Sequence, residues 1–260
     1  MPGDFAPWAR RLCDRHRGAG ADGVLRYRIA AGAVQMRLIN ADGGEVELSG
    51  NGVRCLAAYV HQKGWLPASH VVETPSGPRP VAVQREGPFR FRVETDLGAP
   101  LLRSDAIPVA LAPAAASVVD HPLAAAGAEL RVTATSMGNP HCALFLEEVA
   151  DDALVARLGP ALENHPFFPR RTNVEFVTVK GRDELRVRFW ERGVGPTAAS
   201  GTGSASAFVA AVLKGLVERK GRAVCDGGVL AMEWPEGGSV RQTGEVELLF
   251  DGEWFGSPAR

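Results

Sequence analysis

Hydrophobic and polar positions alternate along many short segments of this chain, as they do in strands with one buried face. Val34–Ile39 shows the pattern clearly, because apolar residues take every second position of that segment. Turn residues such as Asn40-Ala-Asp-Gly follow it. The same reasoning predicts strands at Glu45–Leu48, Val71–Thr74, Val81–Gln84, Phe89–Glu94, Leu130–Ser136, Cys142–Leu146, Val174–Lys180, Glu184–Trp190, Val229–Trp234, Val240–Thr243 and Val246–Phe250.

Two alanine-rich runs are apolar around most of a helical wheel, which is typical of helices enclosed by other elements. The spacing predicts one helix from about Gly52 to Lys63, ended by Gly64, and another from about Ser204 to Leu216. Shorter helices are expected at 6–15 and 151–163. The segment 108–126 is rich in alanine and proline and has weak periodicity, so we expect it to cross between two halves of the chain.

A short phrase occurs twice, each time directly before an alanine-rich run. Ser49-Gly-Asn-Gly and Ser200-Gly-Thr-Gly are 151 positions apart (200 − 49). Backbone N–H groups at such a helix start lack intrahelical partners and carry partial positive charge. Those of Gly50 and Asn51, and of Gly201 and Thr202, can therefore bind a carboxylate. The alternative is that each serine is only an N-cap, a position that serine favours.

The duplication predicts an α+β fold of two pseudo-symmetric half-domains, each a curved, mostly antiparallel sheet around a central helix, with a ligand cleft between them. The expected boundaries are 1–115 for the N-terminal half and 116–245 for the C-terminal half. A terminal strand in 246–260 is expected to return to the N-terminal half.

Composition narrows the classes of function. The net charge of −1 gives no reason to expect nucleic acid or an anionic membrane as a partner. No apolar stretch approaches the roughly 20 residues of a membrane span. Four scattered cysteines without CxxC spacing argue against a zinc site or a disulfide framework and favour a cytoplasmic protein.

A series of motifs then resembles the diaminopimelate epimerase family over nearly the whole chain, from about Arg10 to Gly252. The motifs stand in the family's order: Gly18-Ala-Gly-Ala-Asp-Gly23, Asn40-Ala-Asp-Gly43, Gly50-Asn-Gly-Val-Arg54, Ser136-Met-Gly-Asn-Pro-His141, Arg171-Thr-Asn173, Glu191-Arg-Gly-Val-Gly195, Gly201-Thr-Gly203 and Gly227-Gly228. The resemblance implies a fold similar to that of proline racemases and a reaction without pyridoxal phosphate, metal or other cofactor.

In that family two cysteines face the substrate Cα from opposite sides, one removing a proton as thiolate and the other returning one. Ser49 and Ser200 occupy those two places here. An alkyl hydroxyl titrates roughly 5 units above a thiol, which is about 7 kcal/mol, whereas a helix N-terminus offers only ~0.3–2 kcal/mol. Serine therefore needs a neighbouring base. By resemblance, His141 and Glu191 also lie in the active site and are the candidate bases.

The resemblance also implies a site for the distal end of the substrate. Arg192 would take the distal carboxylate as a bidentate donor. Asn40, Asn139 and Asn173 would bind the second amino-acid group, since an amide offers both donor and acceptor. Each asparagine could instead be a turn residue. The family's N-terminal phrase His-Gly-x-Gly-Asn-Asp-Phe contributes a further asparagine, and 1–5 does not supply it.

The leading hypothesis is an isomerase that interconverts LL- and meso-diaminopimelate by two-base proton transfer, for lysine and peptidoglycan precursor synthesis. The ligand would be a small amino acid, and a homodimer is possible. Two alternatives stay open. One is a dehydratase or isomerase of the wider superfamily that acts on another amino acid. The other is a non-catalytic amino-acid-binding paralogue.

Overall fold

The computed structural model describes residues 5–30, 32–46 and 48–256. Within them the chain divides into two compact units, residues 1–95 with 245–260, and residues 96–244. The expected half-domain boundaries, including the return of 246–260, stay a prediction. Positions 1–4 of the N-terminal segment discussed above lie outside the described residues, as does position 47 of the expected strand at 45–48. No helix in the described part of the chain is long and apolar enough to cross a membrane.

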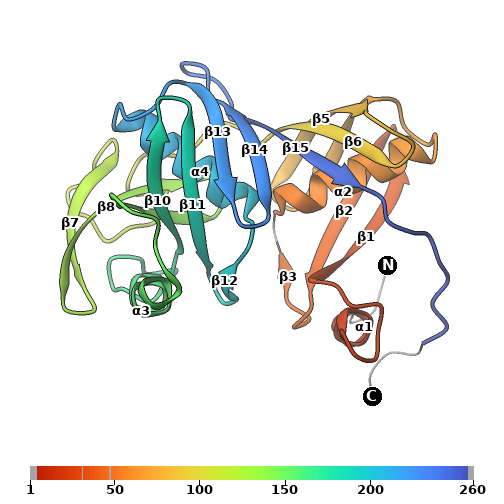
Figure 1. Cartoon of the computed structure of the whole chain (residues 1–260), viewed down its shortest axis with the longest axis horizontal. Helices are drawn as coiled ribbons and strands as arrows, with labels where there is room; N and C mark the ends of the chain where they lie inside the picture. Colours follow the sequence, from red (N-terminus) through yellow and green to blue (C-terminus); the bar gives the residue numbers. More distant parts are fainter. Residues whose placement is uncertain (1–4, 31, 47, 257–260) are drawn as a thin grey trace. The chain divides into compact units, whose positions relative to one another are not determined.

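The first unit is a mixed sheet packed on one central helix (Figure 1). Its strands pair in the order β1-β2-β4-β5-β6, with β3 beside β2, and all of these pairs are antiparallel except β2 with β4. Leu56, Val60 and Phe91 are among the buried residues that join the helix to the sheet. The elements are α1 (Ala6–Cys13), β1 (Gly23–Ala30), β2 (Ala33–Asn40), β3 (Glu45–Val46), α2 (Gly50–Gln62), β4 (Ser69–Thr74), β5 (Gly77–Arg85) and β6 (Arg90–Asp96).

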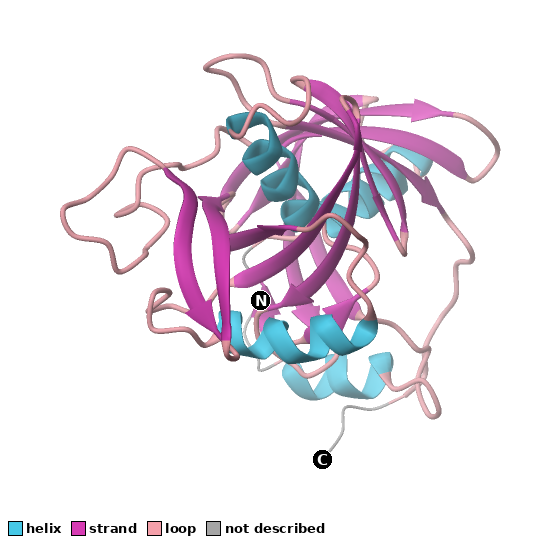
Figure 2. Ribbon diagram, turned by 60° about the vertical axis from the view of Figure 1, so that its left-hand side comes forward, coloured by secondary structure: helices cyan, strands magenta, loops and turns pink. Residues whose placement is uncertain are grey.

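The second unit has the same plan with additional strands. Its sheet runs β14-β13-β11-β10-β9-β8-β7, with β12 beside β11, and only β9–β10 and β11–β13 are parallel. Figure 2 shows the helices in cyan against the magenta strands. The elements are β7 (Val118–Ala125), β8 (Ala128–Ser136), β9 (Pro140–Phe145), α3 (Asp152–Glu163), β10 (Asn173–Gly181), β11 (Glu184–Glu191), β12 (Gly195–Thr197), α4 (Gly201–Leu213), β13 (Lys220–Cys225) and β14 (Gly228–Glu233). The last strand, β15 (Arg241–Glu247), pairs with β14, and its residues 245–247 are counted with the first unit.

The duplicated phrase belongs to a much longer structural repeat. The strands β2, β4 and β6 begin 151 positions before β11, β13 and β15 (184 − 33, 220 − 69, 241 − 90), and α2 and α4 are separated by the same interval (201 − 50). The register of the parallel pair is also repeated, since Val34 lies opposite Val72 and Leu185 opposite Ala223. The α+β class and the central helix of each half are therefore confirmed within each unit.

The central helices differ in how completely they are covered. In α4 every residue from Gly201 to Ala211 is buried, and Phe208 is fully enclosed. In α2 most residues are buried as well, but one narrow face that includes Asn51 and Cys55 is exposed. The strands β8, β9, β10, β11 and β14 all contact α4, which explains why its sequence is apolar on nearly every face.

Some sequence expectations were wrong. The segment 108–126 is not simply a crossover, because its second part forms β7, which pairs with β8. Alanine and proline are weak strand formers, and a bulge with left-handed Asp120 (φ 50°) interrupts the pairing, so no periodicity was visible. In place of the two strands expected at 240–243 and 246–250 there is one strand, β15, which runs through Gly244 and ends at Glu247, so that 248–250 lie outside it.

The alternation pattern also missed β1 and β13, and both central helices begin earlier than expected, at Gly50 and Gly201. The observed starts differ from the expected ones because Ser49 and Ser200 are themselves the N-caps, so that each helix begins at the next residue.

Replacement of Phe208 by alanine is expected to lower the free energy of unfolding by about 3–5 kcal/mol, because it leaves a cavity among buried side chains. Leu213→Ala, at the half-buried end of the same helix, is the control and should cost less than half as much. Urea unfolding followed by circular dichroism measures both. Equal losses would show that the core around α4 is not as enclosed as described.

Candidate functional site

The two helix starts have the same local geometry. Ser49 caps α2 with φ −133° and ψ 115°, and Ser200 caps α4 with φ −140° and ψ 121°. Each hydroxyl oxygen accepts the backbone N–H of the third helical residue, Gly52 at 3.1 Å and Gly203 at 3.2 Å. The first two N–H groups of each helix, at Gly50 and Asn51 and at Gly201 and Thr202, have no partner within their helix. Each helix start can therefore hold a carboxylate oxygen.

In the first unit the candidate residues come from two adjoining segments. Asn40 is the last residue of β2, and its backbone closes a turn with Gly43 and Gly44. The side chain of Asn51 accepts a hydrogen bond from Arg54 Nη2 at 2.5 Å, within the first turn of α2.

In the second unit the structure brings most of the candidate residues together at the ends of three adjacent strands. His141 and Asn173 lie opposite each other in the β9–β10 pair, and Glu191 ends β11. Asn173 Nδ2 donates to the carbonyl of Pro140 at 2.9 Å, and Asn173 Oδ1 accepts the backbone N–H of Arg192 at 3.0 Å. The side chain of Asn173 is thus committed to holding the turn that carries Arg192.

His141 is fully buried and both of its ring nitrogens are engaged. Nδ1 lies 2.7 Å from Glu175 Oε1, and Nε2 lies 3.0 Å from Asn139 Oδ1. Asn139 continues the chain of contacts to Thr202 Oγ1 at 3.4 Å. The network therefore links the core of the sheet to the first turn of α4. Among the described residues of this unit, the Ser200 hydroxyl bonds to Gly203 and not to His141 or Glu191.

Glu175 is a residue that the sequence reasoning missed. It is 1% exposed on β10, and desolvation raises the pKa of its carboxyl, against the opposing charge and hydrogen bond of His141. A signal was present, because a carboxylate interrupts the apolar run Val174-Glu-Phe-Val of a buried strand. Glutamate is almost never buried without a partner, so its position predicts a cation or donor nearby.

The four thiols of the chain are poor candidates for proton transfer. Desolvation is the main cause that raises the pKa of Cys13, Cys55, Cys142 and Cys225, and the pKa of Cys142 is raised the most clearly. None of them is therefore poised as a thiolate in the way that an acid–base cysteine requires. Among the described residues, no three His, Cys, Asp or Glu side chains gather to hold a metal ion.

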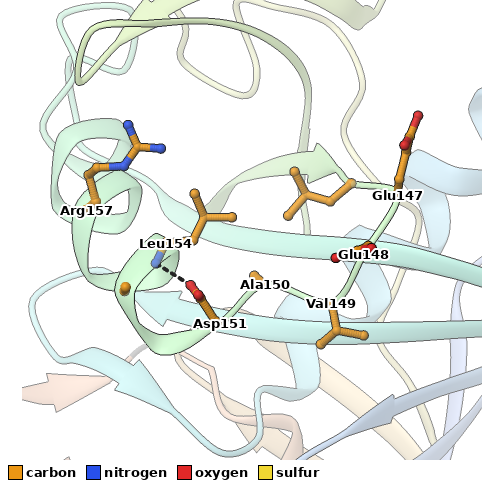
Figure 3. A pocket seen from close by; sticks show the side chains of 9 residues that line it. Glu147, Glu148, Val149, Ala150, Asp151, Leu154 and Arg157 are labelled. Atoms are coloured by element: carbon orange, nitrogen blue, oxygen red, sulfur yellow. Dashed lines mark hydrogen bonds between the residues drawn. The ribbon is translucent and has the colours of Figure 1, made fainter.

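A shallow hollow in the second unit lies away from these residues. It is lined by the loop 146–151 and the first turns of α3, where Asp151 caps the helix by accepting Leu154 N–H at 2.7 Å (Figure 3). None of the candidate site residues lines it.

Comparison with known proteins agrees with the motif series. The family model described as diaminopimelate epimerase matches residues 4–102 and 133–249. A diaminopimelate epimerase of Desulforudis audaxviator is 45% identical over 257 residues, which cover 98% of this chain and 91% of that protein. One from Pelotomaculum thermopropionicum is 43% identical over 256 residues, covering 97% of this chain and 90% of that protein.

Solved structures share the fold at low sequence identity. A hydroxyproline epimerase of Agrobacterium vitis superposes with a TM-score of 0.65 at 15% identity, over 95% of this chain and 83% of that one. A predicted epimerase from Pseudomonas aeruginosa superposes with a TM-score of 0.63 at 19% identity, over 95% and 88%. The family match and the near-full-length relatives show that this chain belongs to the diaminopimelate epimerase family of amino-acid isomerases.

Proposed function

We propose that this chain binds diaminopimelate, and that the helix starts of α2 and of α4 each offer backbone N–H groups to a carboxylate of such a ligand. The observation that carries the proposal is the pair of matched serine-capped helix starts, repeated at a constant interval in a member of this family. A helix N-terminus presents free N–H groups and partial positive charge to a carboxylate. Ser49 and Ser200, the caps of these helix starts, would take the two acid–base positions.

Polar side chains are proposed to bind the distal end of the ligand. Arg192 would pair with the distal carboxylate through its guanidinium fork, and Glu191 would accept from an ammonium group. The amides of Asn40, Asn139 and Asn173 would complete the set, of which Asn173 acts chiefly by holding the Arg192 turn.

The two serine hydroxyls are poorly suited to the acid–base step. Both serine oxygens already accept a helix N–H. The imidazole that could serve as base in the second unit is engaged at Nδ1 and at Nε2. A hydroxyl that titrates roughly 5 units above a thiol lacks about 7 kcal/mol of driving force. These observations favour a second candidate function, a protein that holds the amino acid with little or no turnover.

We infer that the protein acts without a cofactor in the cytoplasm, in the synthesis of lysine and peptidoglycan precursors. The usual role of the family and the scattered cysteines support this inference. A homodimer stays a prediction.

Proton transfer is expected to rise by at least about a thousandfold when Ser49→Cys and Ser200→Cys are combined, because two thiols replace two hydroxyls at helix N-termini. The measurement is hydrogen–deuterium exchange at the Cα of diaminopimelate, after calorimetry has shown that the unaltered chain binds the LL or meso form. Cys55→Ser, the opposite exchange elsewhere on α2, is the control and should change nothing. Absence of binding to both forms defeats the proposal, and unchanged exchange in the double variant removes the two serines from the reaction.

Arg192→Ala is expected to weaken binding of diaminopimelate by more than about 1.5 kcal/mol, the scale of a hydrogen bond to a charged group. Calorimetry gives the dissociation constant. Arg182→Ala removes an arginine of the same unit that pairs with Glu218 at the surface, and it should leave the constant unaltered. Equal constants for the Arg192 variant and the unaltered chain would exclude Arg192 from the site.

Glu175→Leu is expected to destabilise the second unit by about 3–5 kcal/mol, because it leaves the buried His141 without its Nδ1 partner. The double variant with His141→Leu should cost clearly less than the sum of the single variants, since it removes both polar groups. Urea unfolding of the four proteins measures the coupling. Additive losses would mean that the pair contributes no mutual stabilisation.

A further inference from the structure

Glu163, the last residue of α3, is a buried carboxylate that makes more polar contacts than its place at a helix end requires. Its side chain is 7% exposed. Oε2 accepts the indole N–H of Trp190 at 2.7 Å. Oε1 accepts the backbone N–H of Gly193 at 2.9 Å and Arg171 Nη1 at 3.0 Å. Both carboxylate oxygens are therefore used, and the ion pair with Arg171 balances the charge.

Close packing of α3 on β11 makes these contacts possible. Gly159 precedes Glu163 by one helical turn and so lies on the same face of the helix. A Cβ atom at Gly159 would stand 2.5 Å from Cδ2 of the Trp190 ring, which real atoms do not tolerate. The glycine thus lets the indole lie against the helix, and the indole N–H reaches the carboxylate four residues on.

The contacts of Glu163 converge on the turn between β11 and β12. In that turn the N–H of Arg192 goes to Asn173, the N–H of Gly193 goes to Glu163, and Val194 closes the turn on the carbonyl of Glu191. Gly193 has φ 77°, a conformation that glycine adopts freely. Side chains from α3 and β10 therefore capture two successive backbone donors of the segment that carries Glu191 and Arg192.

We propose that Glu163 is a positioning residue, which holds the 191–195 turn so that the side chains of Glu191 and Arg192 are ordered before the amino-acid ligand arrives. The inference rests on the proposed function, since it takes these two residues as ligand contacts. A turn that is already ordered loses less conformational freedom when the ligand binds. The Glu163 carboxylate should therefore increase the affinity of the protein for the ligand. A purely structural role would instead change stability and leave affinity alone.

The test is Glu163→Gln, which keeps the size of the side chain but removes its charge and one of its two acceptors. We expect the dissociation constant of meso-diaminopimelate, measured by calorimetry, to rise at least tenfold. We also expect the amide proton of Gly193 to exchange with solvent at least tenfold faster, as measured by nuclear magnetic resonance without ligand. Asp152→Asn is the matched control on the same helix, because the side chain of Asp152 is 94% exposed and pairs with Arg188 at the surface. It should change both quantities less than twofold.

The outcomes separate this inference from the function on which it rests. If the unaltered chain binds no diaminopimelate, the proposed function fails, and the exchange of Gly193 alone decides whether the carboxylate holds the turn. If the chain binds and Glu163→Gln binds equally well, the positioning role is overturned even if the amide exchanges faster. Should the glutamine variant not fold, Glu163→Asp keeps the charge on a shorter side chain. At least a threefold loss of affinity is then expected, and an unchanged constant overturns the proposal.

Discussion

The parallel pairing of β2 with β4, and of β11 with β13, is the constraint on which the rest of the structure depends. Two parallel neighbours cannot be joined by a tight turn, so the chain must cross from the end of one strand to the start of the next. In both units the crossing is made by a helix, α2 or α4. The helix N-terminus is therefore placed shortly after the end of the first strand, beyond a short β3 or β12. The same connection fixes where Asn40 and Glu191 lie, because they are the last residues of β2 and β11.

The surroundings of the connecting helix differ between the two units. In the first unit α2 keeps one face exposed, whereas strands from several directions enclose α4. The enclosed helix tolerates polar groups only where they are small, as at Ser206, which shares a hydrogen bond with Thr135 of β8. The second unit also supplies the buried carboxylates Glu163 and Glu175, each with a cationic or N–H donor partner. The repeat thus provides two similar helix starts. In the second unit, Asn139 connects the buried His141–Glu175 pair to the first turn of α4, and Glu163 of α3 holds the turn after β11.

Much of the fold followed from local pattern, and most of the network did not. The alanine-rich runs predicted α2 and α4, because a helix that is apolar on most faces has to be covered by other elements. The strand β7 was not predicted, because alanine is a weak strand former. The gathering of Asn139, His141 and Asn173 was expected only from family resemblance. Glu175 lies 34 positions from His141, and Glu163 lies 30 from Gly193. Contacts at such separations depend on which strands and helices meet, and a single sequence does not specify this register.

The serine caps show how both helix starts are formed without a thiol. An N-cap needs an oxygen that accepts the N–H of the third helical residue, and a serine hydroxyl does this well. A thiolate in the same place would receive the same N–H and the same partial charge, which lower its pKa and sustain proton transfer. For a hydroxyl these effects are too small by several kcal/mol. Serine at both positions therefore keeps the two helix starts capped. Under the proposed function, the exchange of thiol for hydroxyl would weaken the acid–base reaction and leave these caps in place.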